Sequence, residues 1–478
     1  MAADQGHLPL AMLPKPSLTF TVPSLHDGLP ISCRVYHPHS LAAAPDAPSW
    51  QKHAAVVAHP YAPLGGCYDD PVVDMMAGTL LRLGFLVATF NFRCGPFSAS
   101  WRPPLRAHGS AGRTSWTAKA ERADYMAVVG FVSHYVHFLD PFTQHTPASS
   151  YKSAVQNDGG LEVDGEVTPP IRIRLPTPTP PEPPSGPAPI LLLGGYSYGS
   201  MITSQLPSVE TIVGLFNAPE CGTPAAEIRL RAQHLAEMQN TVLASAREAA
   251  IDHLRPHSPR KHVGLRVGGD EESRRSHESR RSLSTEFEET IRHGVAELLA
   301  RTRKGHQRSH SGRSHTPRDS DGVLLEHVSD HLPPVPGRTT FLPAYLLVSP
   351  LQGIVTNLAT MSLPPLLSMS GKPWTRFPAR GSNEAVPSGP SEPGAVPAEA
   401  EAKLVQNATL AVYGDRDGFV PVRKLRDWAS RLEAMQDSKF RAHEVSSANH
   451  FWAQRNVAST LREAVGTFAA SLLDDKTG

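Results

Sequence analysis

The chain has 478 residues with a net charge of +1, and 40% of them are hydrophobic and 19% charged, values typical of a water-soluble globular protein. The near-neutral charge argues against nucleic acid or an anionic membrane surface as a partner. The four cysteines are widely spaced without a CxxC pair, which argues against a disulfide scaffold and a zinc ribbon and fits a reducing compartment.

The N-terminal stretch MAADQGHLPLAMLPKPS lacks an apolar core, so we expect no signal peptide. No apolar run approaches the length of a membrane span, and we therefore expect a cytoplasmic protein. Short apolar segments then alternate with amphipathic ones. We predict strands at 18–22, 31–36, 54–58 and 85–90, and helices at 72–83 and 117–139.

The same rhythm returns after residue 189. We predict strands at 190–193, 344–349, 408–413 and 440–445, and helices at 200–206, 421–435 and 457–473. Short apolar strands that alternate with helices predict an α/β fold, in which helices cover both faces of a mostly parallel sheet.

Three stretches interrupt this rhythm. The chain holds 46 prolines, and they cluster, which indicates linkers because the usual share is about half as large. We expect a Pro-rich linker at 141–189, a helical cap at 220–337 with charged disordered stretches, and a low-complexity insertion at 371–403. The cap has helical patterns at 227–252 and 285–303. The remaining segments, 1–140, 190–219, 338–370 and 404–478, are expected to form one catalytic-type domain.

A single serine stands between glycines and tyrosines in ILLLGGYSYGS, residues 190–200. Residues 195–199 match G-x-S-x-G, the pattern of a nucleophile elbow, in which the serine occupies a sharp strand-to-helix turn. The residues two before and two after the serine approach closely there, so both must be small. An ordinary Gly-rich turn is the alternative. The apolar strand before the motif and the helical segment after it favour the elbow, with Ser197 as the nucleophile.

A serine nucleophile needs a base, and the base needs an acid that orients it, in the chain order Ser, acid, His. The segment ATLAVYGDRDGFVP, residues 408–421, is an apolar strand followed by two aspartates. We favour Asp417 as the acid. Asp415 competes with it, although we expect Asp415 to cap the turn or pair with Arg416. As a further alternative, either aspartate caps the helix that Pro421 begins.

His450 is the predicted base. It lies in the polar loop of HEVSSANHFWAQRN, residues 443–456, from which it can fold back toward the serine. His443 is the rival, but it falls inside a strand pattern. Most of the other histidines, out of 23, lie in the polar insertions.

Acyl transfer also needs hydrogen-bond donors for the developing oxyanion. The backbone N–H of Tyr198 is one expected donor. The second should come from the loop HPYAPLGG, residues 59–66, where Pro60 and Pro63 cannot donate and Tyr61 is our choice. The alternative for this loop is a plain crossover rich in proline and glycine.

These motifs together resemble the α/β-hydrolase superfamily. Within it the chain resembles a group of predicted hydrolases with an HPxPLxGG-type loop, here HPYAPLGG, and an NFR segment, here FNFRCGPFS at 90–98. After NFR the group usually continues with Gly-x-Gly, whereas this chain reads Cys94-Gly95-Pro96. The resemblance covers 18–139, 190–206, 344–358 and 408–473. It implies Ser197 as nucleophile, Asp417 as acid, His450 as base, and Tyr61 and Tyr198 as oxyanion donors.

Large apolar residues beside the motif loops are expected to line the site, with ordinary core packing as the alternative for each. An apolar lining predicts an apolar or aromatic acyl or alcohol group in the substrate. We expect no cofactor and no metal, and we expect His306, His310 and His315 to be solvated. The expected lining residues are Tyr61, Leu64, Phe92, Tyr196, Tyr198, Phe451 and Trp452.

The sequence therefore predicts a serine hydrolase that cleaves a carboxylic ester, with an amide as the second choice. Two alternatives stay open. One is a non-catalytic protein of the same fold that binds a small apolar ligand or a protein partner, and the other is acyl transfer to an acceptor other than water. Arg-Arg pairs next to Ser276 and Ser282 also predict regulation by a basophilic kinase.

Overall fold

The computed structural model describes residues 13–42, 47–93, 117–142, 188–254, 294, 330–352 and 398–474. All described helices and strands belong to one compact unit, formed by Met1–Pro141 and Ala188–Gly478. Several expectations lie outside the described residues: the linker at 143–187, most of the segment 285–303, the serines beside the Arg-Arg pairs, the histidines at 306–315 and the insertion up to residue 397.

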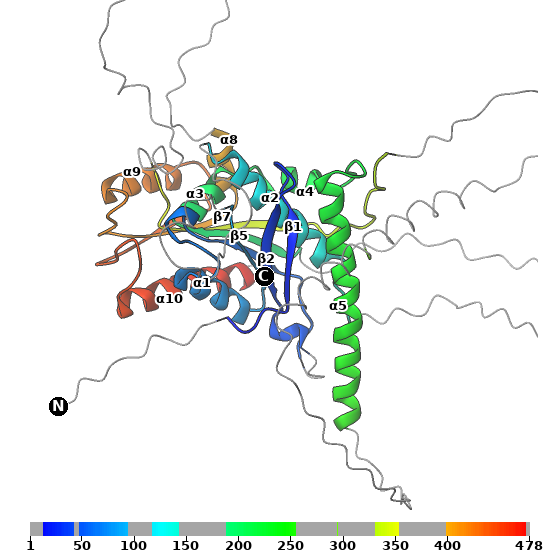
Figure 1. The fold of residues 1–478 in the computed structure, drawn as a ribbon. Helices are drawn as coiled ribbons and strands as arrows, with labels where there is room; N and C mark the ends of the chain where they lie inside the picture. Colours follow the sequence, from blue (N-terminus) through cyan, green and yellow to red (C-terminus); the bar gives the residue numbers. More distant parts are fainter. Residues whose placement is uncertain are drawn as a thin grey trace, which may run out of the picture. The chain divides into compact units, whose positions relative to one another are not determined.

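The described residues form an eight-stranded sheet in the order β1-β2-β4-β3-β5-β6-β7-β8 (Figure 1). β2 pairs antiparallel with β1 and β4, and the pairs from β4 through β8 are parallel. The strands are β1 (Leu18–Pro23), β2 (Pro30–Tyr36), β3 (Ala54–Ala58), β4 (Leu86–Phe90), β5 (Ile190–Tyr196), β6 (Leu342–Val348), β7 (Ala408–Gly414) and β8 (Phe440–Val445).

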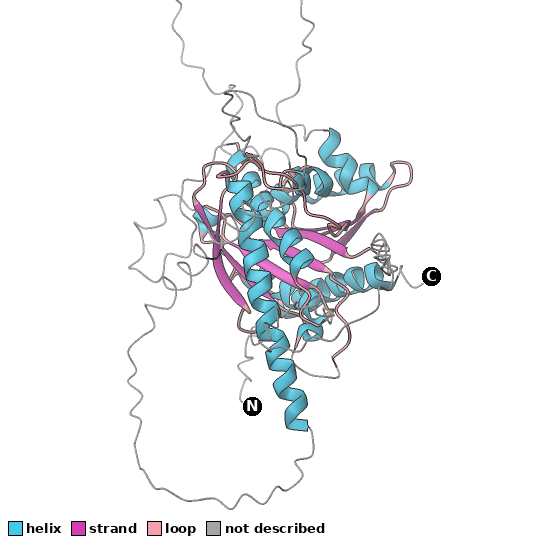
Figure 2. Ribbon diagram, turned by 90° about the vertical axis from the view of Figure 1, so that its right-hand side faces the viewer, coloured by secondary structure: helices cyan, strands magenta, loops and turns pink. Residues whose placement is uncertain are grey.

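Helices cover both faces of this sheet (Figures 1 and 2). On one face α1 (Pro71–Arg82) packs against α10 (Arg455–Asp474), and on the other lie α2 (Lys119–Phe138), α3 (Tyr198–Gln205), α8 (Ala398–Gln406) and α9 (Val422–Glu433). The strand order, the reversed β2 and the two helical layers are those of the α/β-hydrolase fold. The predicted fold class is thus confirmed.

The central strands are apolar on both faces because both faces are covered. Every residue of β3, β4 and β5 is buried. On the α1–α10 side, Val57 and Leu192 pack in one cluster with Met76, Leu80 and Leu461. Burial of each such side chain contributes roughly 1.5–3 kcal/mol to folding. This packing holds the carboxyl ends of the parallel strands together at one edge of the sheet.

Two further helices follow α3 in the chain. α4 (Val209–Gly214) packs on α2, and the long α5 (Pro224–Leu254) lies along α2 and against β1 (Figure 1). The first predicted helix of the cap, 227–252, is therefore part of α5, at the β1 end of the sheet. Short 3-10 turns occur at His39–Leu41 (η1) and Ala62–Leu64 (η2).

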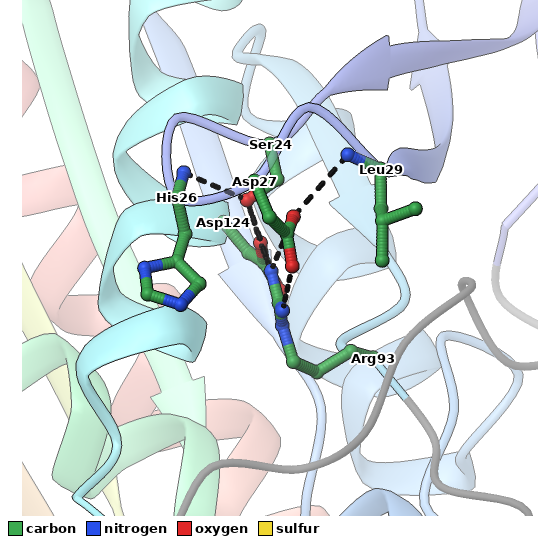
Figure 3. A network of polar contacts seen from close by, with 6 residues as sticks. All are labelled: Ser24, His26, Asp27, Leu29, Arg93 and Asp124. Carbon is green, nitrogen blue, oxygen red and sulfur yellow. Dashed lines mark hydrogen bonds and ion pairs between the residues drawn. The ribbon is translucent and has the colours of Figure 1, made fainter.

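A buried ion-pair network ties the β1–β2 turn to the end of β4 and to α2 (Figure 3). The Arg93 guanidinium donates to both carboxylate oxygens of Asp124, at 2.8 and 2.6 Å, and to Asp27 at 2.7 Å. Ser24 Oγ accepts from Arg93 at 2.9 Å and donates to Asp124 at 2.6 Å. Since buried charges must be paired and hydrogen-bonded, this network fixes the start of the loop that follows β4.

Candidate active site

Ser197 occupies a strand-to-helix turn between β5 and α3. Its backbone has φ 56° and ψ −114°, a conformation that residues with a side chain rarely adopt. Its N–H donates to the Val348 carbonyl of β6 at 2.8 Å, which extends the sheet pairing to the last residue before α3. The strained turn presents the serine at the carboxyl edge of the sheet, with the N-terminus of α3 behind it.

The two glycines of the G-x-S-x-G motif have a steric cause. A Cβ on Gly195 would lie 2.3 Å from the carbonyl carbon of Gly199. A Cβ on Gly199 would lie 2.6 Å from the carbonyl oxygens of Ala58 and His59 at the end of β3. Both distances are far below van der Waals contact, so any larger residue would push the turn away from β3.

His450 connects the serine to an aspartate. Its Nε2 lies 2.8 Å from Ser197 Oγ, and its Nδ1 lies 2.7 Å from Asp417 Oδ2. All three residues are buried, with at most 9% of each exposed. Because a carboxylate only accepts hydrogen bonds, we infer that Nδ1 carries a proton and donates it to Asp417. In the neutral imidazole Nε2 is then an acceptor for the serine hydroxyl.

The two competing aspartates have different partners. The second carboxylate oxygen of Asp417 accepts from the backbone N–H groups of Phe419 at 2.8 Å and Val420 at 3.2 Å, which orients the carboxylate. Asp415 instead accepts from the Ser447 N–H at 2.7 Å. Asp417 therefore lies against the histidine, and Asp415 joins the turn after β7 to the loop after β8.

The loop that carries His450 is held at several points. The Tyr196 hydroxyl donates to the His450 carbonyl at 2.8 Å. A Cβ on Gly414 would lie 2.1 Å from the Ala448 carbonyl oxygen, so glycine permits the close approach of this loop to the end of β7. The rival candidate His443 lies on β8 and is exposed. The loop positions thus bring base and acid together although neither belongs to a helix or strand.

The loop after β3 lies beside the elbow. Tyr198 is the first residue of α3, so its N–H has no acceptor within the helix. The Tyr61 and Tyr198 rings are 5.0 Å apart between centroids. The two residues expected to donate to an oxyanion are therefore neighbours.

His59 fixes this loop through both ring nitrogens. Its Nε2 accepts from the Phe92 N–H at 2.8 Å, and its Nδ1 lies 2.5 Å from the Pro60 carbonyl oxygen, to which it donates. Burial lowers the pKa of His59 to about 4, against a smaller opposing effect of the Pro60 carbonyl, so the ring is neutral near pH 7. The neutral ring joins the end of β4 to the residue before Tyr61, a role the sequence analysis did not assign to it.

The expected lining residues differ in burial. Phe92, Tyr196, Tyr198 and Trp452 are buried, and Tyr61 is partly buried. Tyr196 and Trp452 belong to the core cluster on the α1–α10 side, where the Trp452 indole donates to Ser349 Oγ at 3.0 Å. Leu64 and Phe451 are exposed, at 79% and 62%.

Phe419 is a site neighbour that the sequence analysis missed. Its ring centroid lies 4.4 Å from that of His450. An aromatic residue two positions after the candidate acid, directly after the segment GDRDG, was the available signal.

Lys403 of α8 has a buried amine at the far end of α3. Its amine donates to the carbonyls of Thr203, at 2.9 Å, and Leu206, and so satisfies the C-terminal carbonyls of this helix. Burial lowers the pKa of Lys403 to about 7.

Among the described residues, no group of three or more histidine, cysteine or acidic side chains is arranged to hold a metal ion. None of the described helices is long and apolar enough to cross a membrane.

No protein-family model matches the chain, and no curated protein is similar to it in sequence. Among solved structures it is similar to an α/β serine hydrolase homologue from Coxiella burnetii, at 12% identity and a TM-score of 0.34, over 95% of this chain and 98% of that one. An α/β serine hydrolase without a lid from Xanthomonas campestris is 15% identical, with a TM-score of 0.35 and 96% of both chains covered. Est1E from Butyrivibrio proteoclasticus with ferulic acid bound is 10% identical, with a TM-score of 0.36, over 95% of this chain and 99% of that one. These sequence identities and TM-scores are too low to bear on the activity of this chain.

Proposed function

We propose that this chain is a serine hydrolase that cleaves a carboxylic ester through an acyl-enzyme. The observation that carries the proposal is the continuous hydrogen-bonded series from Ser197 Oγ through His450 to Asp417, at 2.8 and 2.7 Å. A nucleophile, a base and an orienting acid within hydrogen-bond reach are the constellation that activates a serine. The strained backbone of Ser197 supports the same assignment.

In this mechanism Ser197 Oγ attacks the carbonyl carbon while its proton passes to His450 Nε2. Asp417 stabilises the resulting imidazolium and keeps the ring in its tautomer. The tetrahedral intermediate collapses, the carbon–oxygen bond to the alcohol breaks, and His450 gives its proton to the departing oxygen. Water then repeats the sequence on the acyl-enzyme and releases the acid.

The oxyanion of the intermediate is assigned to the N–H groups of Tyr198 and Tyr61. The N-terminal position of Tyr198 on α3 supports its assignment, because the dipole of the helix favours negative charge there. The contact between the Tyr61 and Tyr198 rings supports Tyr61 as the second donor. The narrower resemblance to hydrolases with an HPxPLxGG loop stays a prediction, since HPYAPLGG has the same residue types with the second proline shifted by one position.

The test is covalent labelling with a fluorophosphonate probe, which reacts with an activated serine. We expect wild-type protein to label, Ser197→Ala to lose labelling entirely, and His450→Ala to label at least a hundredfold more slowly, as expected for loss of a general base. Ser200→Ala is the matched control, because Ser200 is a buried serine of α3 whose hydroxyl has no hydrogen-bond partner within the described part of the chain.

A folded wild-type protein that never labels would contradict the proposal and would favour a binding protein of the same fold. Labelling that persists in Ser197→Ala would contradict the assignment of the nucleophile. With labelling established, p-nitrophenyl esters and the corresponding anilides distinguish an esterase from an amidase.

A further inference from the structure

Two exposed aromatic rings flank the imidazole of His450, in addition to the buried Tyr196 ring, whose centroid lies 5.7 Å from it. The Phe419 centroid lies 4.4 Å from it at an interplanar angle of 40°, and the Phe451 centroid lies 5.7 Å from it, edge to face. The two phenylalanine rings are 5.8 Å apart and edge to face as well. The three rings therefore form one continuous aromatic surface around the candidate base.

Phe419 and Phe451 are exposed, at 39% and 62%, whereas His450 itself is 4% exposed. Both residues have backbones fixed in the loops that carry Asp417 and His450. The Phe419 N–H donates to Asp417 Oδ1 at 2.8 Å, and the Phe451 N–H donates to Asn449 Oδ1 at 3.1 Å. Large apolar side chains that stay exposed side by side, next to a candidate site, mark a surface that binds something apolar.

The chemistry of the step determines which part of a substrate meets this surface. His450 Nε2 protonates the departing oxygen, so that oxygen must come within hydrogen-bond distance of the imidazole. The carbonyl oxygen turns the other way, toward the N–H groups of Tyr198 and Tyr61. The alcohol portion of the ester, which is bonded to the departing oxygen, is consequently the part of the substrate that lies against the Phe419 and Phe451 rings.

We propose that Phe419 and Phe451 bind the leaving group, and that the substrates are esters of apolar alcohols with an aromatic ring or a long alkyl chain. This inference rests on the proposed function, because it places the leaving group from the role of His450. Aromatic rings attract such groups by burial of apolar surface and by edge-to-face packing.

The experiment compares two ester series. In the first the acyl group is acetyl, and the alcohol grows from methyl through butyl to benzyl. In the second the alcohol is methyl, and the acyl group grows from acetyl through hexanoyl to phenylacetyl. We expect Phe451→Ala and Phe419→Ala each to lower kcat/KM for benzyl acetate relative to methyl acetate by about tenfold, the scale on which an apolar contact discriminates substrates. The ratio between methyl phenylacetate and methyl acetate should stay within about twofold.

Met435→Ala is the matched control, since Met435 is an exposed apolar residue at 45% just beyond α9, and it should change neither series. Phe451→Leu should retain most of the alcohol preference. Equal effects on both series, or none on either, would overturn the inference.

Fluorophosphonate labelling separates this inference from the proposed function. Wild-type protein that labels but shows no preference along the alcohol series would overturn the leaving-group assignment alone. Protein that neither labels nor hydrolyses any ester would overturn both.

Discussion

Asp415 and Asp417 carry the same side chain two positions apart, yet only one lies against His450. The turn after β7 directs Asp417 toward the histidine, at 2.7 Å, and Asp415 toward the Ser447 N–H, at 2.7 Å. The difference comes from the backbone of the turn, since both residues could accept the same hydrogen bond. The same substitution at Asp415 and at Asp417 therefore gives a matched pair of variants.

We expect Asp417→Asn to lower kcat by about ten-thousandfold, the loss that the same change causes in a serine-protease triad. The asparagine oxygen stays with the Phe419 and Val420 N–H groups, so its NH2 group faces Nδ1 and can only donate. The imidazole then adopts the other tautomer, and Nε2 no longer takes the serine proton. Asp415→Asn retains an oxygen for Ser447 and should stay within about threefold of wild type by the same reasoning. Steady-state ester hydrolysis measures both, and equal losses in the two variants would contradict the choice of Asp417.

Individual site residues could be predicted from the sequence where their chemistry depends on the spacing of neighbouring residues. Ser197 could be named because Gly195 and Gly199 lie two positions on either side, and the close contacts of both glycines explain why. The contact of Phe419 with His450 and the hydrogen bond that His59 Nε2 accepts from the Phe92 N–H could not be predicted, because each joins two loops that are distant in the sequence. The catalytic roles of the named residues stay predictions until labelling is done.

Among the elements, the strand predictions agree with the sheet to within a few residues, since apolar runs of β3, β4 and β5 are buried on both faces. The start of α3 was predicted at Ser200, whereas the helix begins at Tyr198. Glycine and tyrosine are poor helix formers, so local propensity disfavours a start there. The packing of the elbow against β3 outweighs that preference.

The network in Figure 3 joins three elements, and its two carboxylates differ in burial. The Asp124 side chain is 1% exposed and that of Asp27 is 33% exposed, while the Arg93 side chain that both contact is 4% exposed. We expect Asp124→Asn to destabilise the fold by about 3–5 kcal/mol, because it leaves a buried guanidinium without its main counter-ion.

Asp27→Asn is the control for this prediction. Its partly exposed carboxylate should contribute about 1 kcal/mol or less, since water screens the pair. Urea unfolding of the two variants gives both free energies of unfolding. Similar losses for the two would show that burial of Asp124 is not what makes the network stabilising.

At the scale of the whole molecule, the order of the strands in the sheet could not be predicted from the apolar pattern of the sequence. β5 lies between β3 and β6, although residues 59–189 separate it from β3 in the chain. Such pairing depends on contacts between distant segments and on the handedness of the crossovers, which apolar periodicity does not encode. The alternation of strands and helices was nevertheless sufficient to predict a mostly parallel sheet with two helical layers.

Buried histidines distributed over the fold make its stability depend on pH. Burial lowers the pKa of His59 and of His134 to about 4, from 6.5 for an unperturbed histidine, and both side chains are fully buried. Half-buried His37 has its pKa lowered to about 4 by burial as well. Between pH 6.5, the pKa of an unperturbed histidine, and about pH 4, the pKa in the folded protein, the unfolded chain binds protons that the folded chain does not. This contribution to stability is therefore present above pH 6.5 and is lost as the pH falls toward 4.

We expect the free energy of unfolding to fall between about pH 6.5 and 4 by up to about 1.4 kcal/mol per pH unit for each of these histidines. Urea unfolding at half-unit pH steps measures the slope. His134→Asn should reduce the slope by the share of one histidine, because asparagine can still donate to the Gly130 carbonyl that His134 Nδ1 contacts at 3.0 Å but cannot take up a proton.

Burial raises the pKa of Asp70, and this carboxyl acts in the opposite direction, since it binds a proton more readily in the folded state. Asp70 therefore gives a slope of the opposite sign to that of the histidines. A free energy of unfolding that is the same at pH 7 and pH 5 would contradict their neutral burial. Because protonation of His59, which sets in near pH 4 in the folded protein, would remove the acceptor of the Phe92 N–H, ester hydrolysis should fail at the lower end of this range.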